Sequence, residues 1–333
     1  MSLAPPDAAR TEAGARRMTA SAQVWSWLKV VIGAFVFAVG LRAFAFDAYR
    51  IPSTSMEDTL LVGDFVFVSK LHYGARVLGR RLPGFREVER GDVIVFHYPP
   101  GLEPLDDRTP YIKRVVGLPG DSIVIADKAV RAGAEALPPP AEGRQLWEVR
   151  LGGAFPADTL RSLGLDGRVQ RVADGLWLAE ATATQADRLG AVEGVETVRP
   201  FVRPLGDGSA AFPAAARFSL DNYGPVAVPE AGATVRLGDE TWPLYRTAIE
   251  RFEGHTAERT ATGFLIDGQP AETFTFALDY FFVLGDNRDD SADSRTWGFV
   301  PRDHLIGKAV LIYYSWDADA AAPRWDRFGK AVE

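Results

Sequence analysis

The pattern of apolar residues changes once along the chain, near residue 46. Before that point, Val30–Leu41 is a continuous uncharged run with aromatic residues on both sides. As a helix, Trp25–Phe46 would span roughly 33 Å at ~1.5 Å per residue, which matches the ~30 Å apolar core of a bilayer. Aromatic residues at both ends of such a helix are typical of membrane interfaces. The pattern therefore predicts a transmembrane anchor over residues 24–46.

Basic residues surround this helix unevenly, with four of them (Arg10, Arg16, Arg17 and Lys29) ahead of the apolar run. The positive-inside tendency then places a tail, residues 1–23, in the cytoplasm and the rest of the chain outside it. A cleaved signal peptide is the alternative, because Ala43-Phe44-Ala45 resembles a cleavage tripeptide. Arg42 argues against cleavage, because signal peptides are normally uncharged there. We expect a single-pass protein.

Beyond residue 46, short runs of β-branched and aromatic residues replace the helical pattern. Such runs, bounded by turn residues, are typical of strands. Three of them follow Gly-Asp turns, and no helical crossover separates neighbouring runs, so the pattern predicts a mainly β fold with an antiparallel core. The runs are Phe65–Val68, Val93–Phe96, Tyr111–Val116, Ser122–Ile125, Phe281–Leu284 and Val310–Tyr314.

A region of different character, residues 129–262, interrupts these strands. It opens with a loop-like stretch, Ala129–Arg144, and holds two helical patterns, Ala181–Leu189 and Trp242–Phe252. We expect it to be an inserted, non-catalytic α+β subdomain. The catalytic β-core would then consist of two segments, followed by a C-terminal tail: residues 47–128, 263–316 and 317–333.

Composition and charge narrow the chemistry. The chain has 333 residues and a formal net charge of −7, so it lacks the basic character that nucleic-acid binding requires, and we expect no nucleic acid as partner. It has no cysteine, which removes disulfides and thiolate chemistry. Its four histidines are scattered without metal-like spacing, and we expect no metal and no cofactor. A nucleophile must be an oxygen or an amine.

Two clusters in the first half of the chain could carry such chemistry. Ile51–Leu60 is a serine-containing turn directly after the anchor, and by itself it is also typical of a linker. In the strand Tyr111–Val116, Lys113 and Arg114 must face opposite sides, although solvated cations at a sheet edge have the same pattern. A buried lysine can activate a serine, because burial lowers its pKa from ~10.4 toward neutrality. The histidines leave a Ser-His-Asp arrangement open.

The third cluster, Gly285–Arg295, is rich in aspartate. A calcium loop starting at Asp286 fails, because its sixth position is serine rather than glycine and its twelfth is Trp297 rather than glutamate. Pairing of the aspartates with the arginines of the same loop is the better structural interpretation.

Together, these clusters resemble the ordered motifs of type I bacterial signal peptidases. The resemblance rests on four boxes: Pro52-Ser53-Thr54-Ser55-Met56, Gly63-Asp64, Tyr111–Arg114 with Gly117–Asp121, and Gly285–Pro301. It implies a serine endopeptidase of the inner (plasma) membrane with an antiparallel β-core of the signal-peptidase type. Its partners would be the lipid bilayer and the signal peptides of exported preproteins, which it would remove with a Ser/Lys dyad.

The resemblance also assigns roles residue by residue. Ser55 matches the nucleophile, Lys113 the general base, and Ser53 the side-chain half of an oxyanion hole that the Ser55 backbone N–H completes. Arg114, on the other face of the strand, is expected to be dispensable. In the aspartate-rich loop, the matches are a hydroxyl that orients the lysine, a supporting ion pair and a further acidic residue: Ser291, Asp293 with Arg295, and Asp286.

Two departures and two rival functions remain. Asp58 stands where the family usually has proline, so the turn after the nucleophile lacks a fixed φ angle. The insertion has no assigned role, and scaffolding and preprotein docking are both open. A self-cleaving repressor-type Ser/Lys protease would carry a DNA-binding domain in place of the anchor. A membrane-tethered, extracytoplasmic β-domain acting as a binding or assembly module would leave the Ser/Lys boxes unexplained.

Overall fold

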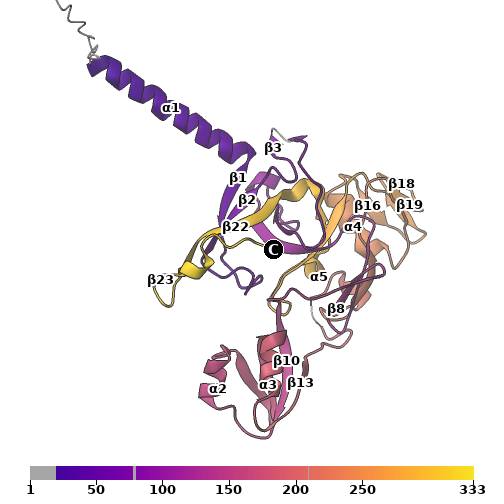
Figure 1. Ribbon diagram of the computed structural model, residues 1–333. Coiled ribbons are helices and arrows are strands. Elements are labelled where there is room, and N and C mark those ends of the chain that lie inside the picture. Colours follow the sequence, from indigo (N-terminus) through magenta and orange to yellow (C-terminus); the bar gives the residue numbers. More distant parts are fainter. Residues whose placement is uncertain (1–19, 78–79, 209) are drawn as a thin grey trace, which may run out of the picture. The chain divides into compact units, whose positions relative to one another are not determined.

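The part of the chain that the structure describes begins with a long helix. The computed structural model describes residues 20–77, 80–208 and 210–333, and it divides into a unit that ends at Ala43 and a second unit, Phe44–Glu333 (Figure 1). Helix α1 spans Ala20–Phe44, and its segment Val24–Arg42 is long and apolar enough to cross a membrane. The side chains of this helix that the structure describes are mostly exposed. Most of the expected cytoplasmic tail lies outside the described residues.

The second unit is built on one large sheet, and every strand pair in it is antiparallel, as predicted. Its strands in spatial order are β1 (Phe46–Arg50), β2 (Asp64–Ser69), β22 (Leu305–Asp317), β5 (Val93–His97), β6 (Pro110–Gly117), β20 (Tyr280–Leu284) and β21 (Val300–Pro301), and β23 (Ala322–Pro323) pairs with β22. Five of the six predicted strand runs lie in this sheet, and the sixth is β7 in the next. The Gly-Asp turns are also present: Gly63 has φ +93°, and a Cβ there would lie 2.2 Å from the carbonyl oxygen of Trp316.

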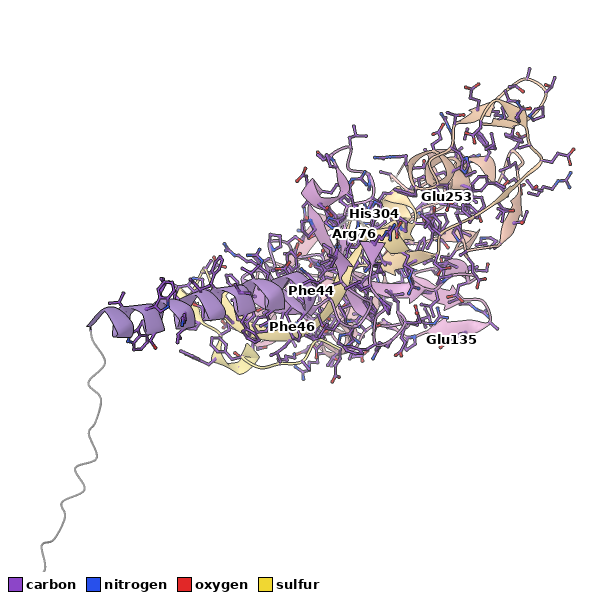
Figure 2. All side chains as sticks on the ribbon, turned by 90° about the horizontal axis from the view of Figure 1, so that it is seen from above. Phe44, Phe46, Arg76, Glu135, Glu253 and His304 are labelled. Carbon is purple, nitrogen blue, oxygen red and sulfur yellow. The ribbon has the colours of Figure 1, made fainter. Side chains whose placement is uncertain are left out.

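A second sheet and helix α4 cover part of the first sheet. The order of this sheet is β14 (Tyr223–Ala227), β7 (Ser122–Ala126), β8 (Ala129–Ala132) and β9 (Glu135–Leu137). Helix α4 (Trp242–Arg251) was predicted from the sequence. It buries Tyr245, whose ring stacks on that of Phe299, the residue directly before β21. Glu253, labelled in Figure 2, follows α4 and accepts a 2.8 Å hydrogen bond from the hydroxyl of Tyr280 in β20. One apolar core therefore joins this region to the large sheet.

Several short elements complete the second unit. They are β3 (Arg76–Val77), β4 (Arg80–Arg81), β15 (Thr234–Arg236), β16 (Ala257–Arg259), β17 (Phe264–Ile266), β18 (Gln269–Pro270), β19 (Thr273–Thr275), α5 (Ser294–Trp297) and the 3-10 turns η1 (Leu105–Asp107), η2 (Ala214–Ala216), η3 (Arg302–His304) and η4 (Trp325–Arg327).

Two expectations from the sequence need correction. The stretch Ala129–Arg144 is not a loop, because it contains β8 and β9. The hairpin into β8 turns through Asp127 and Lys128, which both have positive φ, a turn usually marked by Asn-Gly rather than by these residues. The C-terminal residues are not a free tail either. Arg327 donates to Asp64 at 2.6 Å in a buried ion pair.

Residues 144–200 form a small layer of their own. Their order is β10 (Arg144–Leu151), α2 (Ala157–Ser162), β11 (Val169–Ala173), β12 (Leu176–Thr182), α3 (Ala183–Gly190) and β13 (Val195–Pro200), with sheet order β11-β12-β10-β13. This βαββαβ subdomain has a separate apolar core, and a capping box of Thr182 and Gln185 starts α3. Because the flanking parts of the expected insertion share the main core, we propose that only residues 144–200 are separable.

Candidate active site

Ser55 lies in the turn between β1 and β2. Its neighbour Met56 and the following Leu60 are fully buried, and the Leu60 amide donates to the Met56 carbonyl at 2.7 Å. The carbonyl oxygen of Ser55 accepts a 3.1 Å hydrogen bond from the amide of Asn287, in the aspartate-rich loop. Both sides of the turn are therefore fixed, and Ser55 itself is 8% exposed.

Lys113 reaches this serine from β6. Side chains alternate across a strand, so Lys113 points inward and is only 3% exposed. Its Nζ lies 2.7 Å from Ser55 Oγ, within proton-transfer distance, and donates to the Ile112 carbonyl at 2.8 Å. The ring of Tyr111 lies 5.5 Å from the amine. The structure therefore brings the Ser55 and Lys113 boxes together.

Burial lowers the pKa of Lys113 to about 8, although the carboxylates of Asp293, Asp286 and Asp290 act in the opposite direction. At pH 7 a group with this pKa is neutral in roughly one molecule in ten, compared with about one in 2,500 for an unperturbed lysine. The amine can thus serve as a base near neutral pH.

Ser53 shares a cleft with the Ser/Lys pair. Its Oγ lies 3.4 Å from Ser55 Oγ, and the next hydroxyl along the chain, on Thr54, donates to Asp290 instead. The cleft has a volume of about 360 Å³ and is lined by Pro52, Ser53, Thr54, Ser55, Thr109, Pro110, Tyr111, Ile112, Lys113, Asp290 and Ala292. The Ser53 hydroxyl therefore lies beside the Ser55 hydroxyl in the same cleft.

Asp293 and Arg295 form the expected ion pair beneath the cleft. Arg295 donates to both carboxylate oxygens of Asp293, at 2.9 and 2.7 Å, and both residues are almost fully buried. Burial would raise the pKa of Asp293, but the pairing with Arg295 outweighs it and lowers that pKa. Asp293 also accepts from the amide of Gly285, where a Cβ would lie only 2.5 Å from the Ser55 carbonyl oxygen. This glycine permits the loop to approach the nucleophile.

Two contacts of the site were not part of the expectations from the sequence. Among the described hydrogen bonds, the Ile112 carbonyl accepts from the lysine amine beside Ser55, and none joins that amine to the buried Ser291 hydroxyl. Arg114 is not a solvated cation. It donates to both oxygens of the buried Asp286, at 2.8 and 2.6 Å, and Asp286 also accepts from Thr59 at 2.7 Å.

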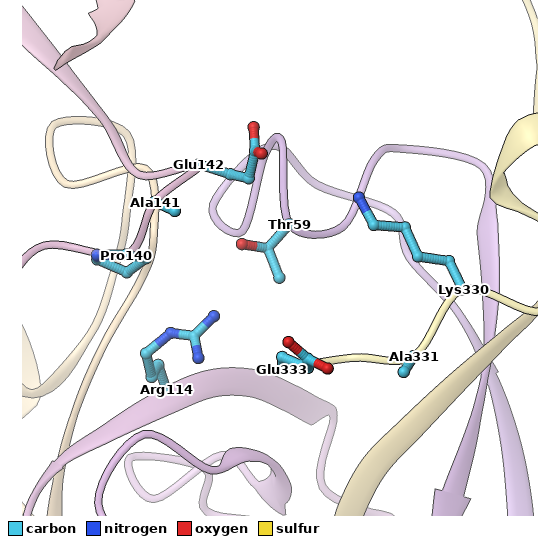
Figure 3. Close-up of a pocket in the computed structure, with 8 residues that line it drawn as sticks. All are labelled: Thr59, Arg114, Pro140, Ala141, Glu142, Lys330, Ala331 and Glu333. Carbon is cyan, nitrogen blue, oxygen red and sulfur yellow. The ribbon is translucent and has the colours of Figure 1, made fainter. Parts of the chain in front are cut away.

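A second pocket, separate from the cleft at Ser55, has Arg114 in its wall (Figure 3). Its volume is about 530 Å³, and it is lined by Thr59, Arg114, Pro140, Ala141, Glu142, Lys330, Ala331 and Glu333. Neither Ser55 nor Lys113 lines it, so the reacting pair opens to the smaller cleft.

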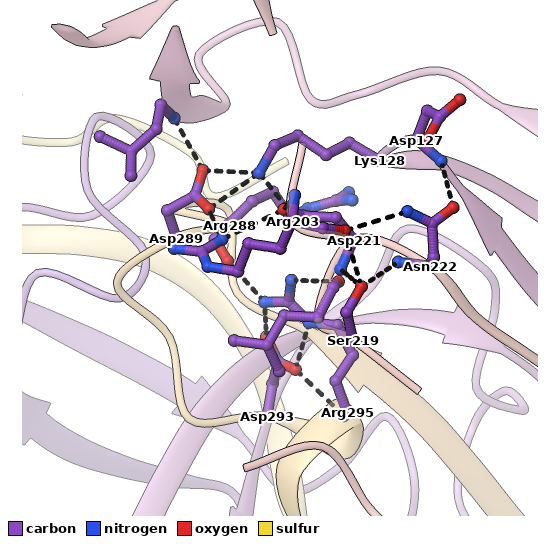
Figure 4. Close-up of polar contacts among 12 residues, drawn as sticks. Asp127, Lys128, Arg203, Ser219, Asp221, Asn222, Arg288, Asp289, Asp293 and Arg295 are labelled. Atoms are coloured by element: carbon purple, nitrogen blue, oxygen red, sulfur yellow. Dashed lines mark hydrogen bonds and ion pairs between the residues drawn. The ribbon is translucent and has the colours of Figure 1, made fainter. Parts of the chain in front are cut away.

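The aspartates of the loop are engaged with cations. Asp289 pairs with Lys128 at 2.8 Å and with Arg203, and Asp221 completes this buried cluster (Figure 4). Within the part of the chain that the structure describes, no group of three His, Asp or Glu side chains could hold a metal ion.

Sequence reasoning missed the partners of Glu57 and Asp58. Arg168 donates to Glu57 at 2.5 Å, and Arg144 donates to Asp58 at 2.7 and 2.8 Å. Asp58 has φ +73°, which proline cannot adopt, so this turn is built differently from one that carries proline. Both arginines lie about a hundred residues away along the chain, and no local pattern marks them.

Comparison with known proteins identifies the class to which this fold and site belong. The sequence profile of the family "Signal peptidase, peptidase S26" matches residues 24–152 and 249–316. The chain belongs to this family of signal peptidases, enzymes that remove signal peptides from preproteins.

Individual relatives agree. The chain is 28% identical to "Signal peptidase I" of Pseudomonas fluorescens over 304 residues, which cover 87% of this chain and 72% of the relative. It is also 28% identical to "Signal peptidase I" of Aquifex aeolicus, over 85% of this chain and 81% of the relative. The family profile ends just after β10 and resumes near the end of α4, so the βαββαβ subdomain apart from β10 lies outside it.

Proposed function

We propose that this chain cleaves preproteins with Ser55 as nucleophile and Lys113 as general base. The observation that carries the proposal is the 2.7 Å distance between Lys113 Nζ and Ser55 Oγ in a buried site that lowers the lysine pKa to about 8. A hydroxyl becomes nucleophilic when an adjacent neutral amine can accept its proton. The close Ser53 hydroxyl supports an oxyanion hole made by Ser53 Oγ–H and the Ser55 amide.

The proposed reaction has two halves. Neutral Lys113 takes the proton of Ser55 as Oγ attacks the scissile carbonyl, and the two oxyanion donors stabilise the tetrahedral intermediate. The resulting ammonium returns the proton to the leaving amine, which departs as the new N-terminus of the mature protein. In the second half, Lys113 takes a proton from water, the hydroxide attacks the acyl-enzyme, and Ser55 recovers its proton as the signal peptide is released.

We also propose that α1 anchors the enzyme in the inner (plasma) membrane, with its N-terminus in the cytoplasm and the β-unit outside. The apolar length of Val24–Arg42 and the basic residues ahead of it support this orientation. Ser55 follows the end of α1 by only 11 residues, at most about 36 Å of extended chain. A membrane-held preprotein would present its cleavage site at that height. The other supporting roles carry over as proposals for Ser291, Asp286, Asp293 and Arg295.

Cleavage of a radiolabelled preprotein by membranes containing the enzyme tests the dyad. Wild type should release the mature product, whereas Ser55→Ala and Lys113→Ala should not. Ser162→Ala, which removes an exposed hydroxyl on α2, is the matched control and should cleave normally. Cleavage by Ser55→Ala at the wild-type rate would refute the assignment.

Because the native chain has no cysteine, single cysteines can test the topology. In intact spheroplasts, a membrane-impermeant maleimide should label Ala157→Cys and spare Ala13→Cys. Labelling of both, or of Ala13→Cys alone, would reject the proposed orientation.

A further inference from the structure

A closed ring of polar contacts connects the nucleophile turn to the βαββαβ subdomain. Glu57, two residues after Ser55, accepts two hydrogen bonds from Arg168, at 2.5 and 3.2 Å. Arg168 also donates to Glu180 at 3.2 Å, and Glu180 accepts from the side-chain amide of Asn287 at 3.0 Å. The backbone amide of Asn287 then donates to the carbonyl of Ser55 at 3.1 Å. The ring therefore begins and ends on the nucleophile turn, and its middle lies in the subdomain.

A second connection runs through Arg144, the first residue of β10. Its guanidinium group binds Asp58 twice and also donates to the carbonyl of Glu180 at 2.9 Å. Its backbone amide donates to the Asp286 carbonyl at 3.0 Å, and its carbonyl accepts from the amide of Arg288 at 2.9 Å. Arg144 is 4% exposed, so one buried residue binds both the turn after the nucleophile and the loop beneath it.

These connections place two arginines beside the nucleophile turn, whose two adjacent carboxylates would otherwise be unfavourable. Glu57 and Asp58 are adjacent carboxylates with side chains only 13% and 21% exposed, so without partners they would repel each other in a poorly solvated position. Asp58 also has a left-handed backbone, which costs free energy for a residue other than glycine. Arg168 binds both carboxylate oxygens of Glu57, a geometry that fixes orientation as well as distance, and Arg144 places two nitrogen atoms on one oxygen of Asp58.

We propose that the subdomain of residues 144–200 is a positioning element for the nucleophile, and that Arg144 and Arg168 are its positioning residues. Neither touches Ser55 Oγ or Lys113, so their effect is to hold the turn that presents Ser55. The inference rests on the proposed role of Ser55. It gives the inserted subdomain a function within the catalytic unit, where scaffolding and preprotein docking had both been open.

The subdomain contains its own control. On the same sheet, Arg199 pairs with Glu148 at 2.7 Å, but the Arg199 side chain is 63% exposed, and among the described residues this pair makes no hydrogen bond to the nucleophile turn. Such exposed pairs contribute little to stability. Arg199→Gln therefore removes the same chemical group from the same subdomain without touching the proposed connection.

The experiment compares Arg144→Gln and Arg168→Gln with Arg199→Gln in two measurements on the full-length enzyme. In preprotein cleavage, the first two should lose roughly 10- to 100-fold in kcat while KM stays close to wild type, because small displacements of a reacting group slow the chemical step. In hydrogen exchange followed by mass spectrometry, peptides covering residues 54–60 should exchange faster in these two variants. Arg199→Gln should match wild type in both measurements.

Conservative variants separate positioning from a loss of folding. Arg168→Lys keeps the charge but loses the two-nitrogen geometry, and Asp58→Asn keeps a residue that tolerates positive φ while it removes the charge. Arg168→Lys should recover part of the lost kcat, and Asp58→Asn should lower kcat as Arg144→Gln does. If the Gln variants unfold at the assay temperature, these two variants decide the question.

The outcomes are distinguishable from a failure of the proposed function. If wild type and Ser55→Ala cleave equally, the Ser/Lys assignment fails, and the exchange measurement still tests whether the arginines hold the turn. If wild type alone is active but Arg144→Gln and Arg168→Gln retain wild-type kcat, the positioning role is refuted, whatever the exchange rates. Unchanged exchange over residues 54–60 would refute it equally.

Discussion

Two buried lysines of the same unit have opposite environments. Lys113, in the large sheet, is surrounded by a hydroxyl, a carbonyl and the ring of Tyr111, and no carboxylate is bonded to it among the described residues. Lys128, in the turn before β8, is also buried, with a side chain only 6% exposed, but it lies 2.7 Å from Asp221 and 2.8 Å from Asp289 (Figure 4).

The difference supports the proposal that Lys113 acts as a base. Removing an ammonium group from water disfavours its charged form, and a bonded carboxylate compensates for that cost. Lys128 has two such carboxylates and acts as a structural cation. The carboxylates near Lys113 are engaged elsewhere: Asp293 with Arg295 and Asp286 with Arg114. Acidic residues therefore lie near the Lys113 amine, but they pair with arginines rather than with the amine itself.

The largest expected effect comes from exchanging each lysine for arginine. Lys113→Arg should lower kcat/KM by at least about 10³-fold, because a guanidinium group stays protonated and cannot accept the serine proton. Lys128→Arg should retain most activity, because a permanent cation is what Asp221 and Asp289 require. Preprotein cleavage measures both. Substantial activity in Lys113→Arg would remove the distinction between the two sites.

Exchanging each lysine for methionine should change stability in opposite directions. Lys128→Met leaves two buried carboxylates with less compensation and should lower the free energy of unfolding by about 3 kcal/mol. Lys113→Met removes an amine whose burial opposes its charge, and at pH 7 it should raise the free energy of unfolding by up to about 3 kcal/mol. Urea unfolding of both variants gives the comparison.

The increase in the free energy of unfolding expected for Lys113→Met should become smaller as the pH rises. The pKa of Lys113 is about 8 in the folded protein and 10.5 when unperturbed, so the unfolded chain binds the proton more tightly. The burial penalty is complete below pH 8 and fades between pH 8 and 10.5, as the unfolded lysine also loses its proton. The stabilisation by Lys113→Met should shrink over this interval. A constant difference between Lys113→Met and wild type would contradict the lowered pKa.

A smaller effect is expected at the oxyanion position. Ser53→Ala should lower kcat by about 100-fold with little change in KM, because its hydroxyl is needed only when negative charge develops on the substrate oxygen. Thr54→Val is the matched control, because the Thr54 hydroxyl donates to Asp290 and should matter much less. Equal effects of the two substitutions would argue against a special role for Ser53.

The sequence predicted the local features and missed the distant pairings. The β-branched runs predicted the strands, and strand alternation placed Lys113 and Arg114 on opposite faces, because period and residue type are local properties. The partners of Glu57 and Asp58 could not be predicted, because Arg144 and Arg168 reach them only through the folded subdomain. The partner of Arg114 could not be predicted for the same reason, since Asp286 lies 172 residues further along the chain.

The same limit applies to the boundaries of the insertion. Helix α4 was predicted from its apolar face, but nothing in that face says which surface it covers. In the structure it packs on the large sheet through Tyr245 and Phe299, and so belongs with the catalytic β-core. Burial partners of this kind become visible only in three dimensions.

The pH dependence of kcat/KM tests the central claim most directly, because it reports the pKa of the group that must be neutral in the free enzyme. Preprotein cleavage should fall as the pH drops, with an apparent pKa near 8, the value for buried Lys113. The same acidic limb should persist in a variant that lacks all four histidines, His72, His97, His255 and His304. An acidic limb near the ~6.5 of free imidazole that disappears with the histidines would contradict the account.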